Sequence, residues 1–431
     1  MKNDFIEELY WRGMIHDIIP ETDQHLNKAS TSGYIGFDPT SDSLHIGSLV
    51  QIIILMHFQK HGHSPIALIG GATGMIGDPS GKSEERSLLN LETLGKNISG
   101  IKSQLMKFLN FDNSINNTAK VLNNYDWTKN YSLIDFSREI GKHISVNYMM
   151  SKESVKKRIG TISNQGMSFT EFTYQLLQGY DFLHLHKHHK CTIQMGGSDQ
   201  WGNITTGTEL IRRKISKKVY AITCPLITKN DGSKFGKTEG GNIWLDKKKT
   251  SPYKFYQYWL NCSDDDAENY IKIFTFLSKN DIDILIKEHS ENPHLRLLQK
   301  KIAQEVTLLV HSREDLENAQ SASNILFGTS TSEDLNNLDE STFLDVFDGV
   351  PMFEISKTEI YKQITMIDAL SGITSFLNSN GEARRALNEK SISVNKLKVG
   401  DGYLIGKSDL INEKYILIQK GKKNYFIIKA V

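Results

Sequence analysis

A glycine-rich segment at residues 70–83, GGATGMIGDPSGKS, ends like a loop that binds nucleotide phosphates. The phosphate-binding loop of nucleotide hydrolases requires Gly-x-x-x-x-Gly-Lys-Ser/Thr, and its first glycine would fall where this chain has Ile76. Pro79 also lacks the backbone N–H that a phosphate cradle needs. The segment nevertheless carries one acid and two bases that could handle a charged ligand: Asp78, Lys82 and Arg86.

A second segment, residues 34–48, places a histidine at the start of an apolar helix. The segment runs from a predicted strand through the turn Asp38-Pro39-Thr40 into that helix. The first N–H groups and the positive dipole end of a helix suit a triphosphate, and His45 stands beside them. Gly47 would leave room for a flat base to approach the backbone. Taken alone, such a histidine is more often a core residue.

A third segment, residues 228–241, is cationic and rich in glycine. Its lysines Lys234 and Lys237 stand three residues apart among small neighbours, so they could close over a polyphosphate. They would then supply positive charge where negative charge develops in a transition state. Taken alone, the segment is better explained by a solvated charged loop.

Together these segments resemble the class I aminoacyl-tRNA synthetases. His45-Ile46-Gly47-Ser48 resembles the His-Ile-Gly-His signature of that class, with Ser48 in place of the final histidine. Residues 234–238, KFGKT, resemble the Lys-Met-Ser-Lys-Ser signature, with Phe-Gly for Met-Ser, as the tyrosyl branch commonly has. Residues 168–182 and 194–204 are similar to the bacterial tyrosyl branch, and the resemblance covers essentially the whole chain.

The resemblance implies a tyrosine–tRNA ligase that works in two steps. The carboxylate of tyrosine attacks the α-phosphate of Mg-ATP, which gives tyrosyl-adenylate and pyrophosphate, and the 3′ terminal adenosine of tRNA(Tyr) then takes the tyrosyl group. No protein nucleophile is required, so catalysis can rest on alignment and on charge stabilisation. The residues that the resemblance assigns to catalysis are His45, Lys82, Arg86, Lys234, Lys237 and Thr238.

The resemblance also implies which residues bind the substrates. Tyr34 and Asp181 would bind the phenolic hydroxyl of tyrosine, and phenylalanine would leave such a buried pair unsatisfied. The residues assigned to the ammonium group are Asp78, Tyr174 and Gln178. The residues assigned to ATP and the adenylate are Gly36, Asp38, Thr40, Gly47, Gly197, Asp199 and Gln200.

The order of apolar runs predicts the elements that must position these residues. In the first half of the chain, short apolar runs alternate with glycine-rich turns and amphipathic stretches, which predicts an α/β domain with a parallel sheet. Ligands of such a sheet bind at the carboxyl ends of its strands. From about residue 252 the spacing becomes helical, and a polar, acidic stretch of weak periodicity follows.

We therefore expect a multi-domain chain. The expected parts are a Rossmann-like catalytic domain at 1–250 with an insertion around 100–165, an α-helical anticodon-side domain at 251–327, a linker at 328–360 and a small S4-like α+β domain at 361–431.

The net charge of +1 is distributed unevenly along the chain. Residues 381–431 hold eleven Lys/Arg and five Asp/Glu, a net +6 that leaves −5 for the rest. Such a basic module indicates a polyanionic partner, although a solvated lysine-rich surface would have the same composition. The segment resembles an S4-type RNA-binding domain, which assigns Arg384 and Arg385 to RNA phosphates.

Cysteine and histidine usage does not favour a metal site. Cys191, Cys224 and Cys262 are far apart and form no Cys-x-x-Cys pair, so we expect reduced thiols. The run at residues 184–189, HLHKHH, looks metal-like, but the interleaved Lys187 is a poor neighbour for a cation. We expect ATP to enter as a substrate with Mg²⁺ and no tightly bound protein metal.

No apolar stretch approaches the ~20 residues that a transmembrane helix needs. The acidic start of the chain is also unlike a secretory signal. We therefore expect a cytoplasmic protein with neither membrane nor DNA as partner. The resemblance implies L-tyrosine, ATP and tRNA(Tyr) as partners and a homodimer as the assembly.

Three alternatives compete with this interpretation. A member of the tryptophanyl branch would not need the Tyr34 and Asp181 pair, and a P-loop NTPase or kinase would need glycine at position 76. A catalytically silent RNA-binding protein would be expected to have lost His45 or the lysines of residues 234–237, and all of these are present.

Overall fold

The computed structural model describes residues 5–80, 88–159, 166–232, 235–238, 241–326, 331–421 and 424–431. The chain divides into two compact units: residues 1–249 with 262–302, and residues 250–261 with 303–431. The segment expected as a helical domain, 251–327, is thus shared between the two units, and the domain boundaries remain a prediction.

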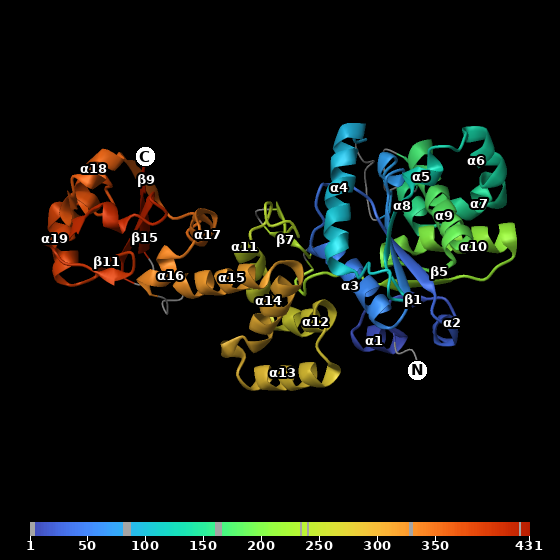
Figure 1. The fold of residues 1–431 in the computed structure, drawn as a ribbon, viewed down its shortest axis with the longest axis horizontal. Helices are drawn as coiled ribbons and strands as arrows, with labels where there is room; N and C mark the ends of the chain where they lie inside the picture. The colour runs from blue at the N-terminus through green and yellow to red at the C-terminus, as the bar shows by residue number, and fades with distance from the viewer. Residues whose placement is uncertain are drawn as a thin grey trace. The chain divides into compact units, whose positions relative to one another are not determined.

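A six-stranded sheet organises the first unit, in the order β1-β6-β5-β2-β3-β4 (Figure 1). Neighbouring strands run parallel, except that β1 is antiparallel to β6. The strands are β1 Asp17–Ile18, β2 Ser32–Phe37, β3 Ser64–Ile69, β4 Lys120–Asn123, β5 Cys191–Gly197 and β6 Tyr220–Cys224. The α/β class with a parallel sheet, predicted from the alternation of apolar runs, is confirmed.

The strand order reverses beside β2. From β2 the chain passes through helix α3 (Ile46–Lys60) to β3 on one side, whereas β5 lies on the other side of β2. Open α/β sheets bind their ligands in the crevice that forms at the carboxyl ends of the strands at such a point. The loops that follow Phe37 and Gly197 therefore lie where a ligand is expected.

The sequences of β3 and α3 explain why this layer forms. In β3 every residue from Pro65 to Ile69 is buried, as expected for a strand that is covered on both faces. In α3 the residues from Ile52 to Leu55 are all buried, so the helix is enclosed by its neighbours rather than lying on the surface. Burying each large aliphatic side chain contributes about 1.5–3 kcal/mol.

Helices surround the sheet of the first unit (Figure 1). The helices assigned to this unit, besides α3, are α1 Phe5–Trp11, α2 Thr22–Lys28, α4 Leu91–Phe108, α5 Tyr125–Thr128, α6 Leu133–Glu139, α7 Val146–Met150, α8 Glu153–Ile159, α9 Phe169–His189, α10 Trp201–Ile215, α12 Asp264–Phe274 and α13 Lys279–Glu291. Short 3₁₀ turns lie at Thr73–Met75, Gly141–His143, Ser198–Gln200 and Pro293–Leu295, and β7 Lys237–Thr238 pairs with β8 Gly241–Asn242.

Two glycines allow α9 and α10 to pack closely. A Cβ atom on Gly179 of α9 would lie 3.4 Å from the Cα of Gly207 on α10. Ser168 begins α9 as its N-cap and accepts a hydrogen bond from the N–H of Glu171. This long helix is therefore fixed at its start and along its side. Within the described residues, no helix is long and apolar enough to cross a membrane.

The second unit contains a five-stranded sheet in the order β12-β11-β14-β15-β9. Its neighbouring strands are antiparallel, except that β9 runs parallel to β15. The strands of this unit are β9 Met352–Ile355, β10 Ile364–Thr365, β11 Ile392–Val394, β12 Leu397–Lys398, β13 Leu404–Ile405, β14 Tyr415–Lys420 and β15 Asn424–Ala430. The helices are α11 Pro252–Leu260, α15 Arg313–Leu326, α16 Ser332–Asn336, α17 Glu340–Val346, α18 Lys357–Tyr361, a π-helix at Asp368–Ile373, a 3₁₀ turn at Lys407–Asp409 and α19 Asn380–Asn388, while α14 Leu297–Val310 spans the division.

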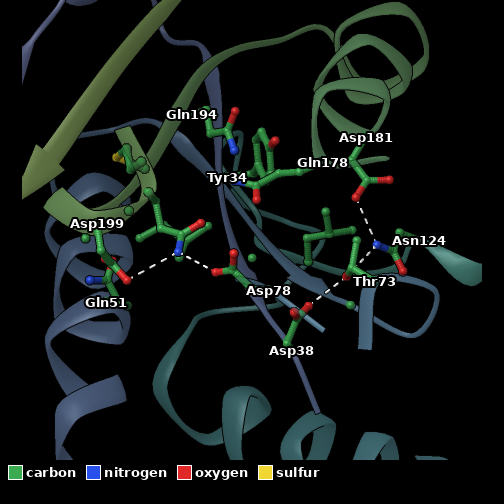
Figure 2. Close-up of a pocket in the computed structure, with 18 of the residues that line it drawn as sticks. Tyr34, Asp38, Gln51, Thr73, Asp78, Asn124, Gln178, Asp181, Gln194 and Asp199 are labelled. Atoms are coloured by element: carbon green, nitrogen blue, oxygen red, sulfur yellow. Dashed lines mark hydrogen bonds between the residues drawn. The ribbon is translucent and has the colours of Figure 1, made fainter. Parts of the chain in front are cut away.

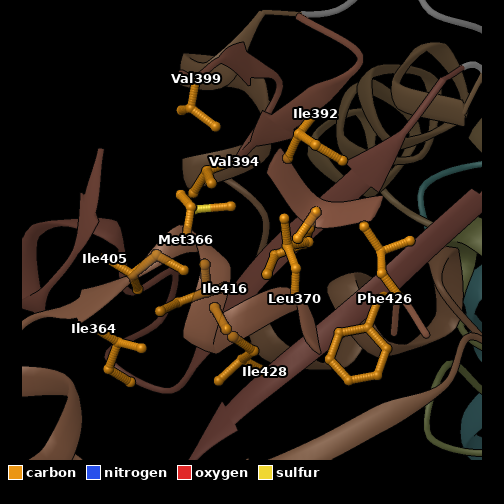
Figure 3. Close-up of a cluster of buried hydrophobic side chains, with 14 of the residues drawn as sticks. Ile364, Met366, Leu370, Ile392, Val394, Val399, Ile405, Ile416, Phe426 and Ile428 are labelled. Atoms are coloured by element: carbon orange, nitrogen blue, oxygen red, sulfur yellow. The ribbon is translucent and has the colours of Figure 1, made fainter. Parts of the chain in front are cut away.

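Both faces of this sheet are covered. Alternate residues of β14 point to opposite faces, so Ile416 and Ile418 join one core, which includes Leu370 of the π-helix (Figure 3). Tyr415 and Leu417 join the other core, together with Phe343 of α17 and Ile325 of α15. The sheet is thus the middle layer of its unit.

Part of the segment expected as a linker is folded. Residues 332–355 form α16, α17 and strand β9, and the ring of Phe343 stacks on Tyr415 at 5.1 Å. Thr331 and Asp334 form a capping box at the start of α16. The polar, acidic composition that suggested a linker includes such helix caps, and α16 and α17, with five and seven residues, are each too short to show a sustained helical period.

His57 in α3 makes the first unit sensitive to acid. Its side chain is buried, and within the described residues neither ring nitrogen has a hydrogen-bond partner. Burial, and then the nearby Arg12 cation, lowers the pKa of His57 to about 3. Because the unfolded histidine binds a proton below about pH 6.5, the unfolded state gains protons that the folded state does not bind. The contribution of the neutral His57 ring to the free energy of unfolding is complete above pH 6.5 and is lost as the pH falls toward 3.

We predict that His57→Phe makes unfolding less dependent on pH. Phenylalanine can keep the ring contact with Phe276, whose centroid lies 4.6 Å from that of His57. One such group contributes at most about 1.4 kcal/mol per pH unit. The midpoint of urea unfolding, measured at pH 7.5 and pH 5, should fall less in the variant than in the wild type. The exposed His294 provides the control, because His294→Gln should keep the wild-type loss; equal losses in all three proteins would contradict the prediction.

Candidate functional site

A cavity of about 270 Å³ lies at the carboxyl ends of β2 and β5, at the point where the strand order reverses (Figure 2). The lining residues come from β2 and its following turn, from α3, from β3 and its following loop, from the residue directly after β4, from α9, and from β5 and the segments after β5 and β6. Those assigned from the sequence are Tyr34, Gly36, Asp38, Thr40, Asp78, Tyr174, Gln178, Asp181, Gly197, Asp199 and Gln200. All of the residues expected to bind the tyrosine, and most of those expected to bind the nucleotide, thus surround one cavity.

Tyr34 and Asp181 form a buried polar pair at the cavity wall. Tyr34 is 1% exposed, and its Oη has no hydrogen-bond partner within the described residues. Burial, followed by the neighbouring Asp181 charge, raises the pKa of Tyr34 well above its usual value. Burial also raises the pKa of Asp181 to about 7. A buried hydroxyl without a partner is costly, so this pair is suited to a ligand that brings a hydroxyl group.

Two side chains orient the carboxylate of Asp181, and Figure 2 shows the bond from the first of them, Asn124. Asn124 Nδ2 donates to Oδ2 at 2.9 Å, and Trp127 Nε1 donates to Oδ1 at 2.9 Å. Each oxygen of Asp181 therefore has one partner within the protein. The two donors stand three residues apart at the start and on the first turn of α5, so a single helical face presents both.

Asp38 is the centre of a second network. Tyr174 Oη donates to its Oδ2 and Thr73 Oγ1 donates to its Oδ1, both at 2.7 Å. Asn124 Nδ2 also donates to Thr73 Oγ1 at 3.1 Å, so the Asp38 and Asp181 networks are joined. Gly70 makes this arrangement possible, because a Cβ atom there would overlap Asp38 Oδ1 and Thr73 Oγ1.

Asp78 is held by donors from the start of α10. Gln200 Nε2 donates to Oδ2 at 2.6 Å, Asn203 Nδ2 donates to Oδ1 at 3.3 Å, and the backbone N–H of Ser80 donates to Oδ1 at 3.0 Å. Asp199 lies beside this group, and burial, followed by the charge of Asp78, raises its pKa.

The cavity is acidic. Four carboxylates line it, those of Asp38, Asp78, Asp181 and Asp199. No lysine or arginine is found among its described lining residues. Carboxylates in a confined space favour a cationic group. The arrangement therefore suits a ligand with an ammonium group as well as a hydroxyl group.

His45 and the segment of Lys237 lie together at the start of α3, the helix that contributes Gln51 to the cavity lining. His45 Nδ1 accepts a hydrogen bond from the N–H of Gly47 at 3.0 Å, and a Cβ on Gly47 would come within 2.7 Å of the ring. Glycine is therefore needed at position 47 also because a side chain there would collide with the ring of His45. Backbone bonds from Ile46 N to Ile243 O and from Ile243 N to Gly236 O tie the two signature segments together, at 3.0 Å each.

Some assigned residues cannot be placed. Lys82, Arg86 and Lys234 lie outside the described residues, as does the side chain of Thr238. Lys237 is exposed on β7. Arg384 and Arg385 are both exposed on α19, with Ala383 and Ala386 buried on the opposite side of the helix.

Several residues of the site were missed at the level of sequence. They are Gln51, Thr73, Asn124, Trp127, Gln194, Asn203 and Leu226. Asn124 had a usable signal, because it directly follows β4 and so stands at the carboxyl end of a parallel strand. Trp127 had none, because its partner Asp181 is 54 residues away in sequence. Asn203 lies in the recognised segment 194–204, but its partner Asp78 is 125 residues away, so no role was assigned to it.

The histidine run at residues 184–189 has other contacts than a metal. The ring of His184 stacks on Trp127, with centroids 4.3 Å apart and planes at 12°. His186 Nδ1 lies 2.9 Å from the backbone oxygen of Cys191. Among the residues that the structure describes, no group of three or more His, Cys, Asp or Glu is arranged to hold a metal ion.

The chain matches two protein families. The family described as tRNA synthetases class I (W and Y) matches residues 26–328, and the family described as Tyrosine--tRNA ligase SYY-like C-terminal domain matches residues 342–428. Among curated proteins, the chain is 63% identical over 432 residues to a tyrosine--tRNA ligase of Flavobacterium psychrophilum, and the match covers 100% of both chains. It is 59% identical over 426 residues to that of Porphyromonas gingivalis, with 99% of each chain covered.

Solved structures show the same similarity over about three quarters of the chain. A C-terminally truncated mitochondrial tyrosyl-tRNA synthetase of Aspergillus nidulans superposes with a TM-score of 0.66 at 29% identity, covering 75% of this chain and 94% of that one. The corresponding protein of Coccidioides posadasii gives a TM-score of 0.63 at 32% identity, covering 73% and 90%.

We predict that Gly70→Ala destabilises the protein through the Asp38 network. The added methyl group must displace Asp38 or Thr73, and overpacking of this kind costs about 1–3 kcal/mol. Gly36→Ala is the matched control, because Gly36 lines the same cavity and a Cβ there meets no atom within 4 Å. Thermal unfolding should show a lower midpoint for Gly70→Ala and little change for Gly36→Ala; equal midpoints would contradict the assigned role of Gly70.

Proposed function

The chain belongs to the class I tRNA synthetases of the tryptophan and tyrosine type, and from this premise we propose how its residues act. Its activity is that of a tyrosine–tRNA ligase, with ATP as a substrate. In this reaction tyrosine and ATP give tyrosyl-adenylate and pyrophosphate, and the tyrosyl group then passes to the 3′ terminal adenosine of the tRNA. The observation that carries the proposal is the unpaired hydroxyl of Tyr34 beside the buried carboxylate of Asp181, in a cavity that is otherwise acidic.

Tyr34 and Asp181 select the substrate by its hydroxyl group. The phenol of tyrosine donates to Asp181 and accepts from Tyr34, so both buried groups gain a partner. Phenylalanine leaves the Tyr34 hydroxyl without a partner and deprives Asp181 of a third donor, and an unpaired buried hydroxyl costs about 1–3 kcal/mol. Large discrimination then needs no editing site, a behaviour for which tyrosyl-tRNA synthetases are the usual example.

Asp78, Tyr174 and Gln178 hold the ammonium group at the other end of the substrate. Asp78 is oriented by Gln200 and Asn203, and Tyr174 is oriented by its bond to Asp38. The four carboxylates of the cavity together make it attractive to a cation, and no described lysine or arginine of the lining competes for that place.

ATP binds along the start of α3 and the loop after β5. The residues proposed to contact the nucleotide are Gly36, Asp38, Thr40, Gly47, Gly197, Asp199 and Gln200. Gly36 has open space where a side chain would stand. Mg²⁺ enters with ATP, as part of the substrate.

Catalysis rests on positioning and on charge at the leaving phosphates, with no protein nucleophile. Because Nδ1 of His45 accepts from Gly47, its neutral ring carries the proton on Nε2 and can donate it toward a phosphate oxygen. Lys237 supplies positive charge from the segment that is tied to α3. Lys82, Arg86, Lys234 and Thr238 keep the catalytic roles that the family resemblance assigns to them.

The C-terminal module contacts the tRNA. Arg384 and Arg385 stand exposed on one helix of a segment whose net charge is +6, which suits the phosphates of a folded RNA. We retain the domain boundaries, with a catalytic domain at 1–250, a helical domain at 251–327, a linker at 328–360 and an S4-like domain at 361–431.

A homodimer in the cytoplasm is the proposed setting. Large apolar side chains on the first unit are strongly exposed, among them Leu133, Ile134 and Phe169 at 74%, 69% and 74%, and such side chains are typical of an interface. Sedimentation of the full chain tests the assembly, and a monomer at micromolar concentration would refute it.

We predict that exchange of pyrophosphate into ATP depends on tyrosine. The full chain with ATP, Mg²⁺ and labelled pyrophosphate should exchange when tyrosine is added and should remain at background with phenylalanine or tryptophan. Exchange that does not need tyrosine, or that tryptophan supports equally, would refute the proposed selection.

The double variant Arg384→Gln, Arg385→Gln separates the two steps of the reaction. Exchange should be unchanged, because adenylation takes place in the first unit, whereas kcat/KM for charging tRNA should fall and depend less on salt. Unchanged charging would remove the arginines from the RNA contact.

We predict that tyrosine use rises with pH through about 7. Burial raises the pKa of Asp181 to about 7, so its carboxylate is partly protonated at neutral pH and is a full acceptor for the phenol only above that value. In the exchange assay, kcat/KM for tyrosine should increase from pH 6 to pH 8. Asp181→Asn should lower kcat/KM for tyrosine at every pH and remove its increase between pH 6 and pH 8. Tyr34→Phe should lower kcat/KM but keep that increase. If the increase of kcat/KM with pH survives in Asp181→Asn, another group must be responsible for it.

A further inference from the structure

The first histidine of the run at residues 184–189 contacts the machinery that binds the substrate. His184 lies on α9 three residues after Asp181, so both stand on the same face of the helix. Its ring stacks on Trp127 with centroids 4.3 Å apart and planes at 12°, which is a nearly parallel arrangement. His188, one turn later, lies against His184 at 4.4 Å, and Tyr180 meets it edge-on at 6.1 Å.

Trp127 connects this stack to the substrate-binding carboxylate. Its Nε1–H donates to Asp181 Oδ1 at 2.9 Å, while Asn124 holds Oδ2. Trp127 is only half-buried and belongs to α5, a helix of four residues. A helix this short is held mainly by its tertiary contacts. The indole therefore depends on its neighbours for its orientation, and His184 covers one of its faces.

We propose that His184 is a positioning residue for tyrosine selection: its ring holds the indole of Trp127, and the indole N–H in turn orients the carboxylate of Asp181 toward the phenol of the substrate. The inference rests on the proposed role of Asp181. When the stack is lost, Trp127 can turn away, and Asp181 loses one of the two donors that favour and orient its ionised form.

The histidine suits this position because it stays neutral there. Burial, and then the neighbouring His188, His189 and Lys187, lowers the pKa of His184 to about 4. At neutral pH the ring offers a flat face to the indole without a positive charge. The histidines of the run thus gain a structural explanation that needs no metal.

The test compares two variants of similar size that differ in the ring. His184→Leu fills the space without a flat π face, and His184→Phe keeps one. In pyrophosphate exchange with the full chain, His184→Leu should raise KM for tyrosine about threefold to tenfold, the effect expected from losing one aromatic stack. KM for ATP should not change, and His184→Phe should recover most of the loss. The ratio of kcat/KM for tyrosine over phenylalanine should fall in His184→Leu alone.

A double variant asks whether His184 acts through Trp127. Trp127→Phe removes the indole N–H, so His184→Leu added to it should raise KM for tyrosine no further. Lys187→Ala, an exposed position on the same helix, should leave every value unchanged.

Several outcomes would overturn the inference. They are a wild-type KM in His184→Leu, equal losses in the Leu and Phe variants, additive effects with Trp127→Phe, and a parallel rise in KM for ATP. Failure of the proposed function would be seen separately, because the wild-type chain would then exchange without tyrosine.

Discussion

The site depends on carboxylates that are held out of water around one cavity. Desolvation raises the pKa of Asp181 to about 7 and also raises that of Asp199, so these groups are kept in the structure at a cost. Hydrogen bonds from Asn124 and Trp127 offset part of that cost at Asp181. The described lining residues include no lysine or arginine to balance the carboxylates, and they provide no hydrogen-bond partner for the Tyr34 hydroxyl. Tyrosine brings both, as its ammonium and its phenol.

Helix α9 sets the distance between the part of the cavity that suits a cation and the part that suits a hydroxyl group. Tyr174, Gln178 and Asp181 are spaced four and three residues apart, so they form one stripe along the helix facing the cavity. The stripe begins at the Asp38 network and ends at the carboxylate that Asn124 and Trp127 orient. The cap at Ser168 and the close packing against α10 hold the helix in place. A rigid helix therefore suits the proposed binding, in which residues of one helix contact both the ammonium group and the phenol of tyrosine.

The parts of the site that lie in continuous segments were predicted from sequence, and the parts that depend on partners far along the chain were not. The turn after β2, the stripe on α9 and the loop after β5 are each short stretches with a recognisable composition. Trp127 carries no such signal, because its importance comes from its contact with Asp181. Asn203 lies in a recognised segment, but its contact with Asp78 could not be read from that segment. The polar stretch that suggested a linker contains α16, α17 and β9, because elements of four to seven residues are each too short to show a sustained period.

The amino-acid sequence by itself determined the chemistry: Ile76 and Pro79 exclude a P-loop, and the signature segments around His45 and Lys237 predict a class I synthetase. Only the tertiary structure decided which polar groups are left without partners and which histidine stacks on Trp127. The physical reason is that residue type and spacing are local properties, whereas desolvation and hydrogen-bond satisfaction depend on every element packed around a side chain. Within the described residues, the tertiary structure thus decides that the Tyr34 hydroxyl lacks a partner and that Asp181 already has two donors.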